Sequence, residues 1–348
     1  MAEIFSAKLY SAVKVEEGCA SAAAAYEDGL IDFPFQLQPQ CMLLPHYADS
    51  SRVGYVLQGR AVVGVLLPGE SKERIVLIQV GDVITVPRET YTWWYNDGDC
   101  VFSVVYLGDA SRALNKGSIT HFLLAGPAAV YSGCSWQLLA RASGLSEEAA
   151  QKLLKSQPNR DIAKLERKLC VSPCEGDRAG IVLNVASARF SSHVEGGGFV
   201  AAMTKENLAA LGGLFEFSAS ITRLEANAAR APGFFAAVQL VRVTRGSGRV
   251  QITGMNGACE FDREVKEGSV FVVKKYYVMS AIAGGDGLEW FSIINTEKPL
   301  FHPMVGRASP LNLINAEALG AALNASPELV KLARAHGFSR DVIVPASN

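Results

Sequence analysis

The chain of 348 residues has few charged residues, and these are balanced in sign and spread along the sequence. Asp, Glu, Lys and Arg make up 19% of the residues, and the formal net charge is −1. Proteins that bind nucleic acids usually have a basic patch, and electrostatic membrane anchors have a run of Lys and Arg. Because this chain has neither, we expect no nucleic-acid partner and no membrane partner.

The sequence also lacks a long apolar run and a recognisable targeting segment. No stretch approaches the roughly 18 apolar residues that a membrane-spanning helix requires. The first residues, Met1 to Phe5, have neither the basic start nor the apolar core of a secretory signal. We therefore expect a cytoplasmic protein.

The seven cysteines are odd in number and irregular in spacing, which does not indicate a disulfide scaffold. Cys170 and Cys174 form the only close pair, and no His or further Cys lies near them to complete a zinc site. We expect all seven to be reduced thiols. The sequence also contains no phosphate-binding loop, no dinucleotide fingerprint and no Ser-His-Asp arrangement.

Apolar residues, in contrast, are abundant and make up 49% of the chain. A chain this apolar must bury much of its surface, either in well-filled cores or between subunits. Its length is sufficient for two ordinary domains with separate cores.

The strongest signal in the sequence is an internal repeat. Residues 55–65 have the pattern strand, tight glycine turn, strand, and residues 242–252 have the same pattern. The turn glycines, Gly59 and Gly246, lie 187 positions apart. Further blocks begin at Gly81 and Gly268, again 187 positions apart, and at Phe102 and Phe291, 189 positions apart. Three blocks in nearly one register indicate a duplicated domain.

Within each copy the pattern is that of a mainly β protein. Short runs of Val, Ile, Phe and Tyr alternate with turn residues, which is typical of a jelly-roll β-barrel. Each copy then ends in a helical pattern, for which Ser146 and Ser326 are the predicted N-caps. We therefore predict two jelly-roll barrels, each followed by a short helical arm. The predicted domains are residues 1–158 and 179–348, joined by a more polar linker over 159–178.

Several of these blocks together resemble the legumin-type seed storage globulins of plants, which belong to the cupin superfamily. The similar stretches follow one another in the same order as in that family: 54–60, 64–65, 68–69, 81–83, Pro87, 94–98, 122–126, 288–292 and 303–309. The resemblance implies two cupin barrels assembled as homotrimers through exchanged helical arms, with some members stacked as hexamers. It also implies a nutrient-storage role. The family is usually cut at an Asn-Gly bond between its halves, and no such bond lies in this junction. The chain is therefore similar to an uncleaved cytosolic relative.

Cupin enzymes hold a metal through two His, a Glu and a later His at fixed positions, because imidazoles and a carboxylate suit a divalent ion. The matching positions of the first barrel are His46, Ala48, Arg52 and Thr92. Those of the second barrel are Gly233, Phe235, Gln239 and Met279. One imidazole remains in the first barrel beside an opposing cation, and no ligand remains in the second. We expect no metal, no cofactor and no catalytic residue.

A polar pocket in the first barrel is nevertheless a candidate binding site for a small anion or a phenolic ligand. The residues expected to form it are His46, Tyr47, Arg52, Thr92 and Tyr95. The alternative is that His46 simply packs at the barrel mouth with a satisfied hydrogen bond.

Two further features have a functional and a structural interpretation. Glu89 could act as a general base, or it could be a solvated turn residue after Pro87. Trp93 and Trp94 could form an aromatic wall, but strand alternation directs one ring inward and the other outward.

Three functions are consistent with these observations. The first is a non-catalytic, legumin-like bicupin that acts as a nutrient reservoir and forms a homotrimer or hexamer. The alternative is a cupin that binds a small molecule in its first barrel. A second alternative is a divergent cupin enzyme that uses His46 or Glu89.

Overall fold

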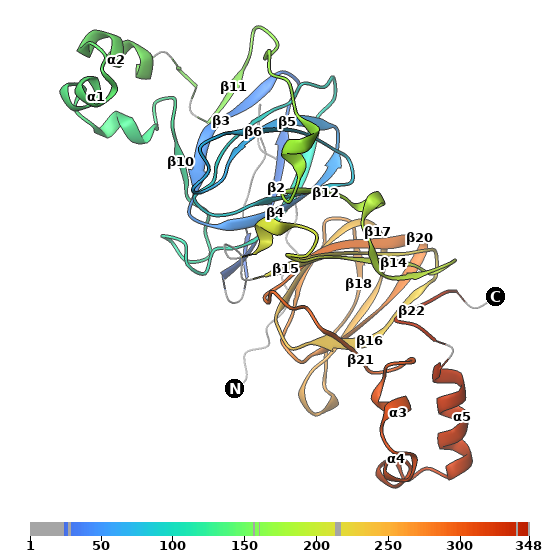
Figure 1. The fold of residues 1–348 in the computed structure, drawn as a ribbon. Coiled ribbons are helices and arrows are strands. Elements are labelled where there is room, and N and C mark those ends of the chain that lie inside the picture. The colour runs from blue at the N-terminus through green and yellow to red at the C-terminus, as the bar shows by residue number, and fades with distance from the viewer. Residues whose placement is uncertain are drawn as a thin grey trace. The chain divides into compact units, whose positions relative to one another are not determined.

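The computed structural model describes residues 24–26, 29–155, 157–159, 161–212, 217–338 and 340–346. Two compact units divide these residues between them. The N-terminal unit contains the described residues of 12–187 and 207–215, and the C-terminal unit contains those of 188–206 and 216–348 (Figure 1). The predicted fold class, two jelly-roll barrels with helical arms, is confirmed in the described part of the chain.

The N-terminal barrel is made of two antiparallel sheets. One has the strand order β1-β2-β9-β4-β7-β12, and the other has the order β10-β3-β8-β5-β6 with β11 also paired to β3. The strands are β1 (Ala24–Ala25), β2 (Leu30–Leu37), β3 (Cys41–Ala48), β4 (Ser51–Gln58), β5 (Arg60–Leu66), β6 (Arg74–Gln79), β7 (Asp82–Val86), β8 (Tyr91–Tyr95), β9 (Phe102–Asp109), β10 (His121–Leu123), β11 (Ile162–Lys164) and β12 (Val182–Asn184). Their inward side chains form one core that includes Val63, Trp94 and Phe102.

The C-terminal barrel is one ten-stranded sheet in which two long strands, β17 with 15 residues and β20 with 17, pair with each other. The strands are β13 (Phe190–Val194), β14 (Gly198–Met203), β15 (Ser218–Leu224), β16 (Ala229–Phe235), β17 (Gln239–Thr253), β18 (Cys259–Lys266), β19 (Val270–Val273), β20 (Val278–Ile294), β21 (Phe301–Pro303) and β22 (Ile343–Val344). The core includes Val241, Phe271 and Trp290.

The repeated glycines occupy equivalent turns in the two barrels, which confirms the predicted duplication. Gly59 and Gly246 have φ of +73° and +74°, and Gly81 and Gly268 have φ of +86° and +84°. This left-handed conformation is strained for other residues, so the turns require glycine. At Gly246 a Cβ would also lie 2.1 Å from the Gly287 carbonyl oxygen.

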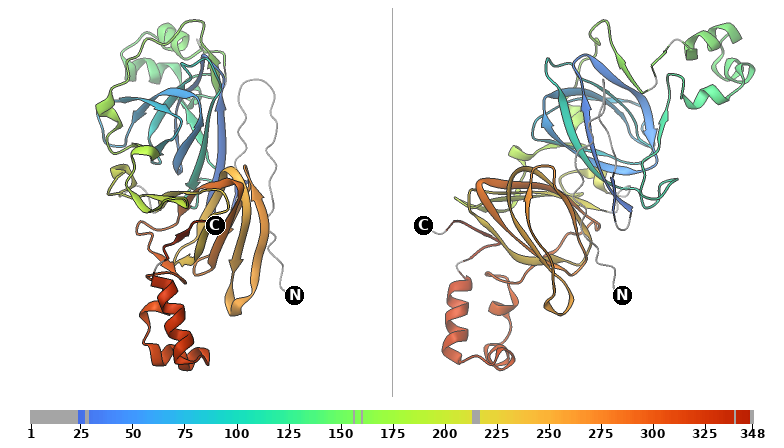
Figure 2. Two further views of the ribbon diagram at one scale, coloured as in Figure 1. Left: turned by 90° about the vertical axis from the view of Figure 1, so that its right-hand side faces the viewer. Right: turned by 180° about the vertical axis from the view of Figure 1, so that it is seen from behind.

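Each barrel carries its own helical arm (Figure 2). The helices are α1 (Trp136–Ser143), α2 (Glu147–Lys155), α3 (Pro310–Leu313), α4 (Ala316–Leu323) and α5 (Pro327–Phe338). Both predicted N-caps are confirmed, because Ser146 Oγ accepts from the Ala149 amide at 3.2 Å and Ser326 Oγ from the Leu329 amide at 3.3 Å. Among the described residues, no helix is long and apolar enough to cross a membrane.

The segment 159–178, predicted as a linker, lies against the N-terminal barrel. Strand β11 of this segment pairs with β3, and the Cys174 amide donates to the Ile75 carbonyl oxygen at 2.9 Å. The six cysteines in the described part of the chain are free thiols, whereas Cys19 lies outside the described residues.

Candidate functional site

A β-bulge in strand β3 decides which of the predicted site residues face the barrel interior. Leu43 pairs with Trp94 and His46 pairs with Thr92, so the register shifts by one residue between these two pairs. Residues three apart on a regular strand would face opposite sides. Because of the bulge, both Leu43 and His46 face inward.

His46 is 1% exposed and hydrogen-bonded through both ring nitrogens. Its Nδ1 lies 2.9 Å from the Leu44 carbonyl oxygen, so Nδ1 carries the proton and donates there. Nε2 then accepts from the Thr92 hydroxyl at 3.3 Å. Burial, reinforced by the nearby Arg52, lowers the pKa of His46 to about 4, so the ring is neutral at neutral pH.

Arg52 is 3% exposed and extends into the barrel from β4. Its Cζ lies 5.6 Å from the centre of the Tyr106 ring, and Nη1 has no hydrogen-bond partner among the described residues. The Asp49 carboxylate is engaged elsewhere, because it accepts from the amides of Leu114 and Thr120 at 3.0 and 2.9 Å. Burial lowers the pKa of Arg52 and raises the pKa of Tyr106. The interior therefore contains a buried cation with an unused donor.

The structure brings His46, Arg52 and Thr92 together but places Tyr47 and Tyr95 elsewhere. Strand alternation turns Tyr47 outward, where its ring stacks on Phe122 with ring centres 4.8 Å apart. Tyr95 lies three residues from Thr92 on β8, whose register against β5 is regular. Because side chains alternate along a strand, Tyr95 and Thr92 therefore face opposite sides of the sheet. The five-residue pocket predicted from the sequence is therefore reduced to three of its members.

His121 and Tyr106 join this cluster, although neither lies at a position that the sequence marks as part of a site. The His121 and His46 rings meet edge to face with ring centres 5.0 Å apart. The centre of the Phe33 ring lies 6.1 Å from the ring centre of His121 and 6.1 Å from that of Tyr106. Desolvation by the surrounding side chains, together with Arg52 and His46, lowers the pKa of His121, although this residue is exposed at the edge of the sheet. His121 reaches the cluster because β10 pairs with β3, a long-range contact that no local motif indicates.

Glu89 and the pair Trp93 and Trp94 have the structural roles, and not the functional ones, that the sequence leaves open for them. The Glu89 side chain is 71% exposed in a turn after Pro87 and lies 3.8 Å from Arg88. Trp94 is 1% exposed in the core, whereas Trp93 faces outward and its Nε1 donates to Glu73 Oε1 at 2.6 Å. Glu89 is therefore not positioned beside His46 as a general base.

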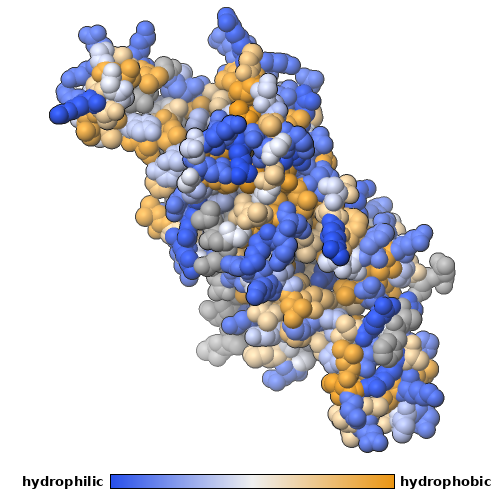
Figure 3. All heavy atoms as spheres, in the orientation of Figure 1, coloured by the Kyte–Doolittle hydropathy of each residue, from blue (hydrophilic) through white to orange (hydrophobic). Residues whose placement is uncertain are grey.

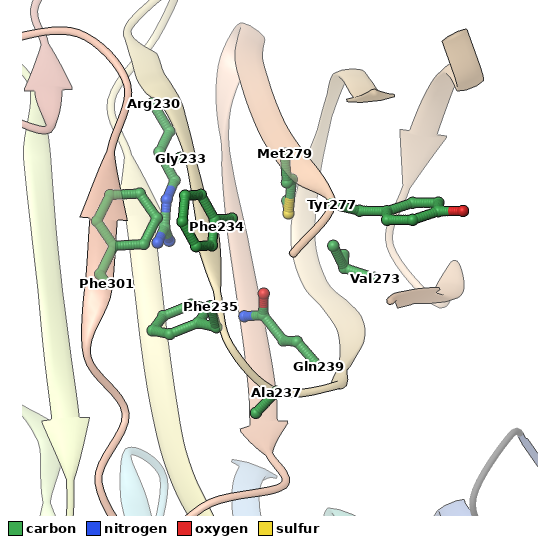
Figure 4. A pocket seen from close by; sticks show the side chains of 10 residues that line it. All are labelled: Arg230, Gly233, Phe234, Phe235, Ala237, Gln239, Val273, Tyr277, Met279 and Phe301. Atoms are coloured by element: carbon green, nitrogen blue, oxygen red, sulfur yellow. The ribbon is translucent and has the colours of Figure 1, made fainter. Parts of the chain in front are cut away.

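No group of three His, Cys, Asp or Glu side chains in the described part of the chain is arranged to hold a metal ion. At the first-barrel ligand positions, only His46 is a metal-ligating side chain, and Arg52 lies where a carboxylate is needed. A cation in this position opposes a divalent metal, so the residues present do not fit one. The second-barrel positions instead surround a small cavity beside Arg230 (Figure 4).

A model of the Cupin family matches residues 33–127 and 184–331, one stretch in each barrel. The chain belongs to the cupin family. This cupin is 25% identical to cocosin 1 of Cocos nucifera over 81% of its own length and 74% of that protein. It is 23% identical to 11S globulin seed storage protein 2 of Sesamum indicum, over 82% and 78% of the two chains.

Solved structures agree with this assignment. The structure of the coconut allergen cocosin has a TM-score of 0.88 with this cupin at 25% identity, covering 99% of this chain and 100% of that one. The 11S globulin of Wrightia tinctoria, described as revealing an auxin binding site, has a TM-score of 0.84 at 21% identity, with coverage of 94% and 92%. The resemblance of the sequence blocks to those of legumin-type seed storage globulins is confirmed.

Proposed function

We propose that this cupin is a non-catalytic nutrient-reservoir protein of the seed storage globulin type. The observation that carries the proposal is similarity to seed storage globulins through both barrels, covering 81–82% of the chain for cocosin 1 and the sesame globulin. The first barrel supports it, because neutral His46 has no acidic partner among the described residues and Glu89 is exposed. Quantifying the protein in developing and germinating seeds tests the proposal. A reservoir accumulates during seed filling and declines on germination, whereas a constant level would contradict storage. The cytoplasmic location stays a prediction.

The proposed reservoir is a homo-oligomer, a trimer or a hexamer of stacked trimers, held together by the helical arms. Apolar residues gather on both arms (Figure 3). Six leucines on the described arm helices are more than half exposed within one chain: Leu138, Leu153, Leu313, Leu323, Leu329 and Leu332. A groove of about 480 Å³ also lies between α4 and α5. We place the N-terminal arm of one copy in this groove on the C-terminal arm of the next copy. Such a head-to-tail contact can close into a ring.

Changing Leu332 to Asp is expected to dissociate the oligomer. Leu332 lies on α5 and is 55% exposed within one chain, so the change leaves the barrel core intact but places a charge in the proposed interface. Loss of a central interface residue typically costs about 2 kcal/mol or more, which weakens association at least roughly thirtyfold. Molar mass from light scattering at micromolar concentration measures the effect.

The matched control is Leu114→Asp, because Leu114 is 73% exposed but lies in a loop outside both arms. This variant should keep the mass of the wild type. A wild-type monomer would contradict the assembly, and an unchanged mass for Leu332→Asp would exclude α5 from the contact.

A second function, binding of a small carboxylate in the first barrel, is favoured by the unused donor of Arg52. A guanidinium pairs readily with a carboxylate, and the neutral rings of His46 and His121 add a hydrogen-bonding and aromatic surface. The Wrightia tinctoria relative, described as having an auxin binding site, makes auxin and benzoate suitable probes.

Calorimetric titration of these carboxylates is expected to show binding that Arg52→Met weakens by roughly tenfold to a hundredfold, the range for a charged hydrogen bond. Arg230→Met, which removes a buried arginine from the other barrel, serves as the control and should bind as the wild type does. Equal binding by Arg52→Met and the wild type would show that the first barrel is not the site.

A further inference from the structure

The interior of the C-terminal barrel contains a cavity of about 10 Å³, lined mostly by apolar side chains (Figure 4). A cavity of this size accommodates one particle about as large as a water molecule. Its polar lining residues are Arg230, Gln239 and Tyr277, and no carboxylate is among the described residues that line it. The sign of the charge inside this cavity is therefore positive.

Arg230 is 5% exposed and makes few polar contacts for a buried cation. Nη1 donates to the Thr222 hydroxyl at 3.0 Å, and this is the only hydrogen bond of the guanidinium within the described residues. The guanidinium carbon lies 4.6 Å from the centre of the Phe301 ring and 5.6 Å from that of Trp290. Burial alone lowers the pKa of Arg230 to about 10, so the side chain remains charged at neutral pH. No carboxylate of the described residues forms an ion pair with it.

The surroundings of Arg230 are built to keep it in place. The guanidinium enters the barrel because the register of β16 against β20 shifts between Arg230 and Gly233, as it does in β3 of the other barrel. A Cβ at Gly233 would lie 2.1 Å from the Phe301 ring, so glycine is what allows that ring to cover the guanidinium. The indole N–H of Trp290 is buried and has no hydrogen-bond partner among the described residues.

We propose that the C-terminal barrel binds one small monovalent anion of halide size, such as chloride, against the guanidinium of Arg230. A buried cation without a counter-charge is costly, and an anion in the adjacent cavity would offset that cost. The cavity is too small for sulfate or an organic acid, and its apolar walls favour a weakly hydrated ion. The cupin barrel that holds a cation in metal enzymes would here hold an anion. This site does not depend on the reservoir function.

Crystals of the full chain soaked in bromide test the site directly. Bromide scatters anomalously and substitutes for chloride, so we expect a bromide peak between Arg230 and the cavity wall. A structure without such a peak would overturn the proposal, and this measurement requires no variant to fold.

Thermal unfolding provides the solution test. At constant ionic strength, replacing gluconate by chloride at a hundredfold excess over the dissociation constant should raise the unfolding temperature of the C-terminal unit by about 5 °C or more. Arg230→Met should abolish this difference, because Met has a similar shape without the charge. Arg52→Met, the matched control in the other barrel, should retain it. An unchanged chloride effect in Arg230→Met would also overturn the proposal.

Discussion

Replacing Asp82 by Ala is expected to lower the free energy of unfolding of the N-terminal unit by about 3 kcal/mol, the cost of breaking a buried ion pair. Asp82 is fully buried, and its carboxylate has four interactions. It accepts two hydrogen bonds from the Arg178 guanidinium, at 2.9 and 3.2 Å. It also accepts from Asn184 Nδ2 at 2.8 Å and from the backbone N–H of Gln79 at 2.9 Å. Removing the carboxylate leaves these donors without their acceptor.

The C-terminal barrel offers a matched control for this prediction. Ser269 occupies the repeat position of Asp82, and its hydroxyl accepts from the amide three residues earlier, that of Lys266, at 3.0 Å. Asp82 makes the same local contact with Gln79 but adds the ion pair. Ser269→Ala should therefore cost only about 1 kcal/mol. Urea unfolding of both variants measures the costs, and equal values would show that the ion pair with Arg178 adds nothing.

Acidification is expected to destabilise the N-terminal unit through His46 by about 3 kcal/mol at pH 4 relative to neutral pH. The pKa of His46 is about 4 in the folded chain, below its usual value of 6.5. As the pH falls below 6.5, the unfolded chain takes up a proton that the folded chain does not, so the unfolded state is favoured. This loss of stability grows until the pH reaches about 4 and then levels off, because the folded chain is then protonated too.

Urea unfolding of the wild type and His46→Gln across pH 4 to 7 isolates this contribution from that of the carboxylates. Glutamine does not titrate, so the stability difference between the two proteins should shift by about 3 kcal/mol over this range. His193→Gln is the control, because His193 is exposed on β13 of the other unit. A pH-independent difference between the wild type and His46→Gln would show that His46 is not buried as a neutral ring.

The fold was predictable from sequence because its signals are local and repeated. A tight turn requires glycine where the backbone adopts positive φ, as at Gly59 and Gly246. A helix begins after a residue whose side chain caps its first turn, as Ser146 does. These signals depend on neighbouring residues alone. Their recurrence after 187 positions therefore indicated two copies of one barrel without any knowledge of distant contacts.

The interior sites were only partly predictable, because strand pairing and bulges decide them. The sequence alone placed His46, Arg52 and Thr92 at ligand positions and showed that metal ligands are missing there. Only the tertiary structure turned Tyr47 outward, brought His121 against His46 through the β10–β3 pairing, and placed Phe301 over Arg230. A shift of one residue in strand register exchanges the two faces of a strand, and that shift is set by contacts between residues far apart in the chain.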